Sequence, residues 1–264
     1  MELVDTHCHI HDSEFAKKYD VSIDDIVENA REVGVNTLVC VGTDVRSSRE
    51  AVIFCRSYDD CYASLALHPH EAADMQDSAI NEVVHELRGL YDPKAPIVAI
   101  GECGLDYFYH QSDEVKKRQQ KLFRSHIELA LELDLPLIFH IRDAFDDFFT
   151  IIDEYPSVSG VVHSFSAHDK QLQGVIERGF YVGLNGIMTF TKDQKQLEAA
   201  KNVPLEKLVL ETDAPFLTPK PFRGTMCEPK HVINITQFLS ELRGESQALL
   251  AKQTTKNAKT LFNL

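Results

Sequence analysis

Short apolar segments alternate with longer segments of helical periodicity along the whole chain. The apolar segments predict eight strands, at residues 3–7, 36–42, 62–67, 97–102, 137–141, 160–164, 180–184 and 208–212. The segments between them predict crossover helices, among them 22–33, 78–90, 115–133 and 144–154, and a further helix follows at 245–261. Regular alternation of this kind is typical of α/β proteins with a parallel sheet.

Polar residues at the ends of the apolar segments favour a closed barrel over an open, doubly wound sheet. In strand after strand the apolar run ends near a histidine or a carboxylate, and these residues are His7, His9, His68, Glu102, His140, His163 and Asp213. In a barrel the C-terminal ends of all strands meet on one face, whereas an open sheet spreads them along an edge. We therefore predict a single-domain (β/α)8 TIM barrel over residues 1–264, with an extra C-terminal helix.

Length and composition fit this fold and narrow the class of protein. A chain of 264 residues, 44% of them hydrophobic, is long enough for one sizeable core. We expect a soluble, cytoplasmic protein, because the chain shows no signal-peptide pattern and no apolar run near the roughly 18 residues of a membrane span. The six cysteines form no CxxC pair, so we expect them to be reduced and structural.

The net charge of -14 excludes a protein that coats nucleic acid without specificity, because a polyanion would be repelled at long range. A nucleic-acid substrate would have to be held by local contacts. Charge alone favours an enzyme that acts on small molecules.

Two histidines close the first apolar segment. His7 and His9 are two residues apart, so on a strand both imidazoles project to the same side and can reach one cation. The alternative is that an HxH sequence occurs here by chance.

Glu102 closes a buried apolar segment, where a carboxylate is costly unless it pairs with a cation. A salt bridge to an arginine is one possibility. We favour a metal ion, because one carboxylate can bridge two cations.

His140 and His163 each close a run of large apolar residues. A lone histidine in such a place is commonly a hydrogen-bonded core residue. Two of them on consecutive strands indicate, together with Glu102, a second cation site.

Asp213 ends the last predicted strand, which neighbours the first strand once a barrel closes. We therefore predict that Asp213 lies near His7 and His9 and acts as metal ligand and proton acceptor. The alternative role is capping of the turn before Pro215. The six predicted ligands offer nitrogen and oxygen atoms and no thiolate, a set that suits two divalent cations, zinc, manganese or magnesium.

Loops that follow the predicted strands carry basic and aromatic side chains, which suit an anionic substrate that bears bases. We expect Arg142 and Arg223 to contact phosphates, and His68 and Tyr107 to contact the substrate as well. Bases could also stack on other aromatic residues of these loops, which are Phe108, Tyr109, Phe165, Phe216 and Phe222. The alternative is that the basic side chains are solvated charges on the loops and that the aromatic side chains form the core of the loops.

Eight motifs follow one another over essentially the whole chain, as DTHCHI, ALHPH, GECGLDY, LPLIFHIRDA, VVHSFS, GFYVGLNGIMTF, ETDAPFLTPKPFRG and TTKNAKTLF. In these motifs the chain resembles the TatD family of metal-dependent deoxyribonucleases, within the wider amidohydrolase-like barrels. The chain departs from the family pattern at HSFSAH, where a glycine often follows the serine, and at TMCEP, where an asparagine usually precedes Glu-Pro.

The resemblance implies that His7, His9, Glu102 and Asp213 hold one cation, while Glu102, His140 and His163 hold the other. It implies a 3′ to 5′ deoxyribonuclease that acts on single-stranded DNA in repair or quality control. Glu102 stands where many amidohydrolases of this superfamily carry a carbamylated lysine, which favours the nuclease branch. We expect a monomer in which water attacks phosphorus and the catalytic residues are Asp213, as proton acceptor, and Glu102.

Two other functions stay open. The same metals could hydrolyse an ester, such as that of an aminoacylated tRNA, or a small lactone. Alternatively, a barrel without catalysis could serve as a binding module, although none of the six predicted ligands is substituted.

Overall fold

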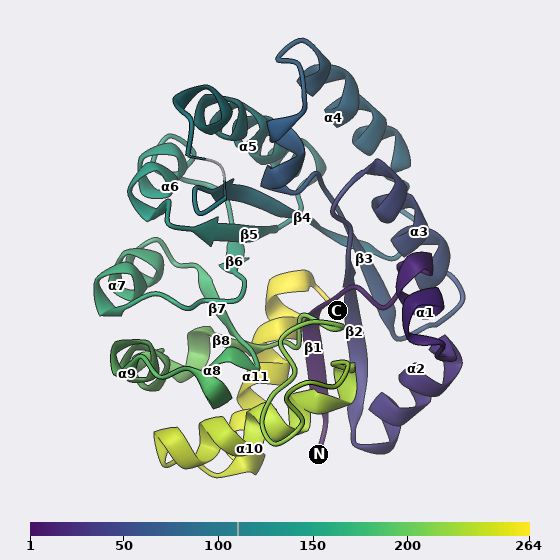
Figure 1. The fold of residues 1–264 in the computed structure, drawn as a ribbon, viewed down its shortest axis with the longest axis vertical. Coiled ribbons are helices and arrows are strands. Elements are labelled where there is room, and N and C mark those ends of the chain that lie inside the picture. Colours follow the sequence, from purple (N-terminus) through teal and green to yellow (C-terminus); the bar gives the residue numbers. More distant parts are fainter. Residues whose placement is uncertain (110) are drawn as a thin grey trace.

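Eight parallel strands form one sheet in the order β1-β2-β3-β4-β5-β6-β7-β8 in the computed structural model, which describes residues 1–109 and 111–264. The strands are β1 (Leu3–Cys8), β2 (Val35–Val41), β3 (Cys61–Leu65), β4 (Ile97–Asp106), β5 (Leu137–Arg142), β6 (Gly160–Val162), β7 (Tyr181–Leu184) and β8 (Leu208–Leu210). They surround a central axis, and helices cover them from outside (Figure 1). The predicted (β/α)8 barrel is confirmed.

Helices follow the strands around the barrel. The α-helices of the described residues are α1 (Ser13–Tyr19), α2 (Ile23–Glu32), α3 (Val45–Cys55), α4 (Ala79–Leu90), α5 (Asp113–Leu133), α6 (Phe145–Ile152), α7 (Asp169–Glu177), α8 (Ile187–Phe190), α9 (Gln194–Asn202), α10 (Val232–Arg243) and α11 (Gln247–Phe262). Three short 3-10 helices lie at Pro69–Ala73, Leu205–Lys207 and Pro229–His231. The extra C-terminal helix of the prediction is α11.

Strand ends differ from the predicted ones by a few residues. β4 was expected to end at Glu102 but continues to Asp106, because Cys103 and Leu105 are buried and the strand stays paired with β5 as far as Arg142. β6 and β8 are instead shorter than predicted and end at the apolar residues that precede the polar ones. The prediction of one domain over the whole chain stays a prediction.

The two faces of the strands pack into two separate cores. The larger core lies between the strands and the surrounding helices, where Leu3 and Leu38 are buried with Ile26 of α2. The alternate strand residues form a smaller core on the barrel side, together with residues of α11; its members are Val4, Val39, Val41, Val98, Ala99, Ile138, Val161, Val209, Ala258, Leu261 and Phe262. Both faces are apolar, as expected for a parallel sheet buried on both sides.

Helix α11 closes the end of the barrel opposite the strand C-termini. The Asn257 side-chain amide donates to the carbonyl oxygen of Leu208 at 2.7 Å, where β8 begins. The Thr255 hydroxyl donates to the carbonyl oxygen of Glu2 at 3.0 Å, just before β1. Because these contacts hold α11 under the first and last strands, its apolar side chains fill the barrel end, and the opposite end stays open for a site.

The barrel closes between β1 and the chain that ends β8 and follows it. The Thr6 hydroxyl donates to the Leu210 carbonyl at 3.0 Å. The Asp5 carboxyl group, whose pKa burial raises to about 8, accepts from the backbone N–H of Thr212 at 2.9 Å and from the Thr212 hydroxyl at 2.5 Å. Further along, the N–H of Asp213 donates to the His7 carbonyl at 2.8 Å. Side chains therefore supply much of a seam that elsewhere in the sheet is a backbone ladder.

Each of the six cysteines is buried and free of a disulfide. Among the described residues, no helix combines the length and the apolar character that crossing a bilayer requires.

We expect Asp5→Ala to lower the free energy of unfolding by about 3 kcal/mol, because it leaves the buried N–H and hydroxyl of Thr212 without an acceptor. The measurement is urea unfolding of metal-free protein. Asp59→Ala is the control, since Asp59 is exposed, and it should change the value by less than about 0.5 kcal/mol. Equal stabilities of the two variants would show that Asp5 does not hold the seam.

Candidate metal centre

The residues predicted as metal ligands lie together at the C-terminal end of the barrel. They come from five strands or the residues that follow them and are His7, His9, Glu102, His140, His163 and Asp213. All but His7, which is buried beneath, line a cavity of about 860 Å³. The barrel therefore gathers on one face residues that are up to about two hundred positions apart in the chain.

Glu102 is the centre of this cluster. Its side chain is only 6% exposed, and its Oε1 atom lies 2.5 Å from Nδ1 of His140 and 3.0 Å from Nε2 of His163. Its Oε2 atom lies 3.3 Å from Nε2 of His7 and 4.0 Å from Nε2 of His9. One carboxylate thus faces imidazoles on both of its oxygen atoms, which is the arrangement that a bridging ligand needs.

A first group of donor atoms joins the start and the end of the chain. The Nε2 atoms of His7 and His9 lie 3.2 Å apart, and Oδ1 of Asp213 lies 3.6 Å and 3.3 Å from them. The other nitrogen of His9, Nδ1, donates to the Val41 carbonyl at 2.8 Å, if Nδ1 carries the proton. That hydrogen bond turns the lone pair of Nε2 toward His7 and Asp213.

A second group joins His68, Glu102 and His140, whose donor atoms lie within 4.8 Å of one another. Nε2 of His68 lies 3.6 Å from Oε1 of Glu102, and the His68 and His140 rings meet edge to face with centroids 4.4 Å apart. The sequence pattern placed His68 among the substrate contacts. The structure places it within reach of the same carboxylate as the predicted ligands.

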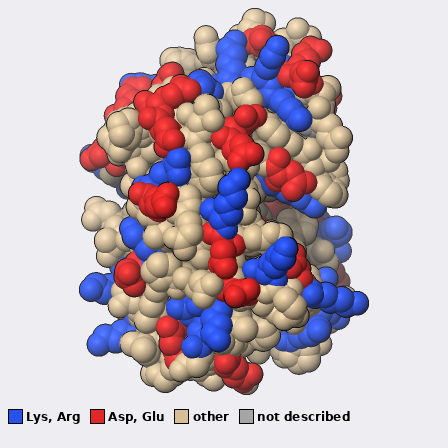
Figure 2. Space-filling model, turned by 90° about the vertical axis from the view of Figure 1, so that its left-hand side faces the viewer, with Lys and Arg blue, Asp and Glu red and all other residues tan. Residues whose placement is uncertain are grey.

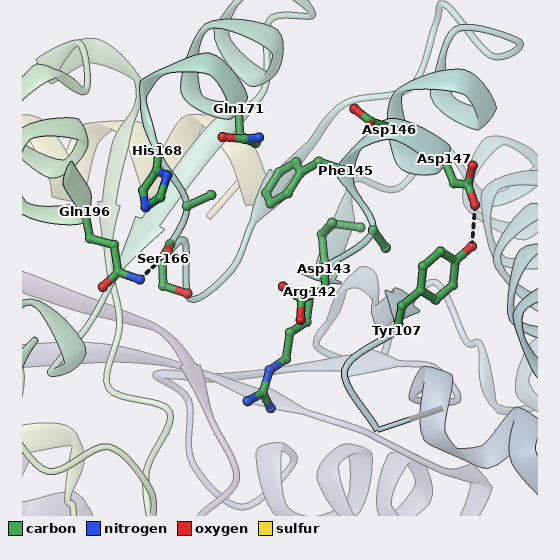
Figure 3. Close-up of a pocket in the computed structure, with 13 residues that line it drawn as sticks. Tyr107, Arg142, Asp143, Phe145, Asp146, Asp147, Ser166, His168, Gln171 and Gln196 are labelled. Carbon is green, nitrogen blue, oxygen red and sulfur yellow. Dashed lines mark hydrogen bonds between the residues drawn. The ribbon is translucent and has the colours of Figure 1, made fainter. Parts of the chain in front are cut away.

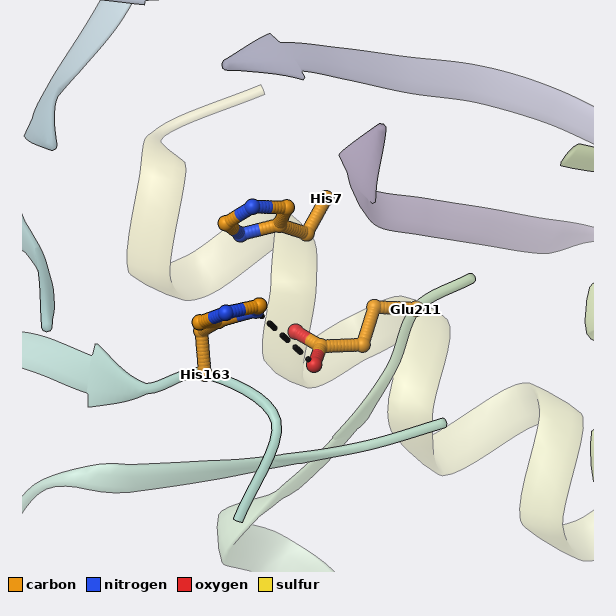
Figure 4. A group of neighbouring side chains, drawn as sticks. All are labelled: His7, His163 and Glu211. Atoms are coloured by element: carbon orange, nitrogen blue, oxygen red, sulfur yellow. Dashed lines mark ion pairs between the residues drawn. The ribbon is translucent and has the colours of Figure 1, made fainter. Parts of the chain in front are cut away.

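His163 lies between the two groups and contacts a further carboxylate. Its ring stacks on that of His7 with centroids 3.7 Å apart, and its Nδ1 atom lies 3.2 Å from Oε1 of Glu211 (Figure 4). Glu211 also accepts from the N–H of Ser164 at 2.5 Å and is almost fully buried. His163 is thus held between Glu102 on one side and Glu211 on the other.

Asp106 and His70 extend the cluster and are not singled out by the sequence pattern. Oδ2 of Asp106 lies 2.9 Å from Nε2 of His70 and 3.2 Å from Nε2 of His140. Asp106 is fully buried at the end of β4, four residues after Glu102. Recognition of the longer strand would have placed both carboxylates on one face, because side chains alternate along a strand.

Burial and neighbouring charges shift the pKa values within the cluster. Burial alone would raise the pKa of Glu102, but the surrounding imidazoles, His163 and His140 first among them, lower it well below its usual value. Burial opposes the charged form of His163, yet Glu102 and Glu211 raise its pKa well above the usual range. Burial and the charge on His140 lower the pKa of His68 to about 3, so His68 is neutral at physiological pH.

The chemistry of this donor set fits divalent cations. Imidazole nitrogens and carboxylate oxygens are ligands of zinc and manganese, and both groups bring three donor atoms within 4.8 Å of one another. A buried Nδ1 atom of His7 has no hydrogen-bond partner among the described residues. The fit supports the predicted ligands, whose role stays a prediction.

The structure separates the residues predicted to contact substrate. His68 and Arg142 line the metal-centre cavity. Tyr107 is 9% exposed, its hydroxyl donates to Asp147 at 2.8 Å, and it lines an adjoining cavity of about 630 Å³ (Figure 3). The two cavities share Arg142 in their walls.

Arg223 lies apart from both cavities, as far as their described walls extend. Its Nη1 atom donates to the Thr218 carbonyl at 2.9 Å, and its guanidinium carbon lies 3.8 Å above the Phe190 ring centre. The structure thus brings Arg142, and not Arg223, to the predicted ligands. Figure 2 shows the side where α6, α7 and α9 lie, and acidic and basic side chains are interspersed over its described surface rather than joined in a basic track.

Comparison with known proteins finds matches over nearly the whole chain. A family model described as TatD related DNase matches residues 4–263. The uncharacterized metal-dependent hydrolase YabD of Bacillus subtilis (strain 168) is 36% identical over 264 residues, 99% of each chain. The 3′-5′ ssDNA/RNA exonuclease TatD of Escherichia coli (strain K12) is 34% identical over 272 residues, again 99% of each. The crystal structure of YJJV, a TatD homologue from Escherichia coli K12, matches with a TM-score of 0.88 at 28% identity, over 99% of this chain and 98% of that one.

We expect Glu102→Gln to abolish the rise in melting temperature that Mn²⁺ gives the unmodified protein, and to weaken Mn²⁺ binding more than about 100-fold, since even outer-shell changes cost 10-fold to 100-fold. Titration calorimetry and thermal melts measure both. Glu71→Gln is the matched control, because Glu71 lines the same cavity but is exposed. Unchanged affinity in Glu102→Gln would rule out Glu102 as a ligand.

We expect Mn²⁺ affinity to rise as the pH is raised above the ordinary histidine pKa of about 6.5, with protons released on binding. The raised pKa of His163 keeps that imidazole protonated in the metal-free protein, and a cation needs its neutral form. Lower pH therefore weakens binding. Calorimetry in buffers of different ionisation enthalpy counts the protons, and Glu211→Gln, which removes one carboxylate that faces His163, should reduce the count. Binding without proton release would contradict this charge state.

Proposed function

Since this chain belongs to the TatD-related DNase family of metal-dependent hydrolases, we propose that it hydrolyses phosphodiester bonds of single-stranded DNA from the 3′ end. The observation that carries the proposal is the buried Glu102 carboxylate with imidazoles on both oxygen atoms, at the foot of an open cavity. A relative at 34% identity is named a 3′-5′ ssDNA/RNA exonuclease, which supports the same bond and polarity. We assign the activity to repair or quality control of DNA ends.

The proposed centre holds two divalent cations. His7, His9 and Asp213 would hold one, and His140 and His163 the other, with Glu102 shared and His68 beside the second. When bound, such cations neutralise the charge of the phosphate and lower the pKa of water. Zinc and manganese match the nitrogen and oxygen donors, whereas four imidazoles make magnesium a poor match.

In the proposed reaction Asp213 accepts the proton of the attacking water. Its carboxylate lines the cavity, and its side chain is 17% exposed. Burial would raise the pKa of Asp213, but the hydrogen bond with His9 and the nearby imidazoles lower it below its usual value. The group is therefore ionised at neutral pH, as a general base must be.

We propose that Arg142 holds the substrate phosphate. It is exposed, lies at the end of β5 two residues after His140, and lines the same cavity as Glu102. In a chain of net charge -14, attraction for a polyanion has to come from basic side chains at this cavity and from the cations. We infer that binding depends on metal more than on bulk charge.

The deciding experiment incubates metal-loaded protein with end-labelled single-stranded DNA, double-stranded DNA and RNA. A ladder that shortens from the 3′ end on single strands supports the proposal. Parallel incubation with aminoacylated tRNA tests the ester-hydrolase alternative, and release of the acyl group without shortening of any strand would replace the proposal with it.

We expect Asp213→Asn to lower kcat on single-stranded DNA by about 100-fold to 10,000-fold, the range of general-base catalysis. Glu14→Gln is the control, because Glu14 is an exposed carboxylate in the wall of the same cavity, and it should keep the unmodified kcat. Quantified release of labelled nucleotide measures both variants. Near-normal kcat in Asp213→Asn would exclude Asp213 as the base.

A further inference from the structure

The aromatic side chains of the loops at the C-terminal end of the barrel differ in their exposure to solvent. Tyr107 and Phe165 are buried, so neither offers a free ring face. Phe222 is 41% exposed but packs against His231, beside a separate cavity. Exposed rings next to the metal centre belong to the remaining three, with Phe108 at 46%, Tyr109 at 60% and Phe216 at 55%.

Tyr109 and Phe216 line the metal-centre cavity at two different places. The Tyr109 ring meets His70 edge to face with centroids 5.3 Å apart, and His70 in turn contacts His68 of the second donor group. The Phe216 ring lies beside His9 of the first group, with centroids 6.3 Å apart. The two rings therefore border the two ends of the candidate metal centre.

The Tyr109 ring is supported from behind. Phe108 meets it edge to face with centroids 4.8 Å apart. The guanidinium carbon of Arg142 lies 3.8 Å above the Phe108 ring centre and 5.0 Å from that of Tyr109. This stack joins the residue proposed to hold the phosphate to a ring that is open to solvent. The side chains therefore form a built platform, in contrast to an isolated surface aromatic.

We infer that Tyr109 and Phe216 are stacking platforms for the nucleobases on the two sides of the scissile phosphate. The inference rests on the proposed function and names its specificity determinants. Covering an exposed apolar ring with a flat apolar partner lowers the free energy. Every base offers such a face, whatever its identity. With the phosphate held between the two rings, the adjacent bases are the parts of the substrate that reach them.

Stacking on protein rings also accounts for a preference for unpaired strands. Bases in a duplex already stack on one another and pair across the helix, so they reach a platform only after unstacking, which costs a few kcal/mol. Single-stranded ends meet no such cost. Tyr109 and Phe216 together, which we call the clamp, therefore select unpaired nucleotides without reading their sequence.

The absence of tryptophan from the chain permits a direct test. The variants Tyr109→Trp and Phe216→Trp each introduce a single tryptophan, whose emission falls when a base stacks on it. The probe is an oligothymidylate with phosphorothioate linkages at its 3′ end, titrated into manganese-loaded protein. Two comparison probes are used. One is the same strand without the two 3′-terminal bases, the abasic strand, and the other is a blunt duplex. Phe222→Trp is the matched control, because Phe222 is exposed but lies by the separate cavity.

We expect the intact single strand to quench both variants and not the control, and the abasic strand to bind unmodified protein about fivefold to 100-fold more weakly. In Tyr109→Ala that difference should shrink. Equal quenching by intact and abasic strands, or no quenching in either variant, would overturn the clamp.

The same proteins separate failure of the clamp from failure of the proposed function. Shortening of a labelled natural strand without quenching would leave the nuclease activity standing and remove the clamp. Quenching without shortening under any metal would leave a binding clamp and remove the nuclease activity.

Discussion

The carboxyl group of Asp5 joins β1 to the chain after β8, and the position of the candidate site follows from that joint. Asp5 accepts from the N–H and hydroxyl of Thr212, and one residue later the N–H of Asp213 donates to the His7 carbonyl. These bonds hold the Asp213 carboxylate within 3.6 Å of the His7 and His9 nitrogens. Strain or loss at the seam would therefore move a predicted ligand of the first group before it affected the other strands.

Within the closed barrel, burial of Glu102 sets the electrostatics of the site. An ionised carboxylate with a 6% exposed side chain is stable only where positive charge compensates it. Without metal, protonated imidazoles such as that of His163 provide this charge. Divalent cations can take over the same role when they displace those protons. Glu102 is therefore paired with imidazoles in the metal-free protein and is available to cations once those protons leave.

The surroundings of the centre reconcile an acidic protein with the proposed polyanionic substrate. A net charge of -14 opposes approach of nucleic acid at long range, so affinity has to arise within the cavity. There, Arg142 offers one positive charge and stacks on Phe108, while Tyr109 and Phe216 offer open ring faces. Stacking is insensitive to the charge of the protein, because it does not depend on the phosphates.

The barrel and the residues that meet at its open end could be predicted from local patterns, which are the alternation of strands and helices and the polar residues at strand ends, His7, Glu102, His140 and Asp213. Contacts between segments that are distant in the chain could not be predicted from those local patterns. The approach of His68 to Glu102, the contact of buried Asp106 with His70, and the separation of Arg223 from the cavity depend on loop paths and on a β4 that runs past its predicted end. So does the difference between a buried Tyr107 and an exposed Tyr109. Contacts of this kind are set by the packing of distant segments, and no period along a single chain records them.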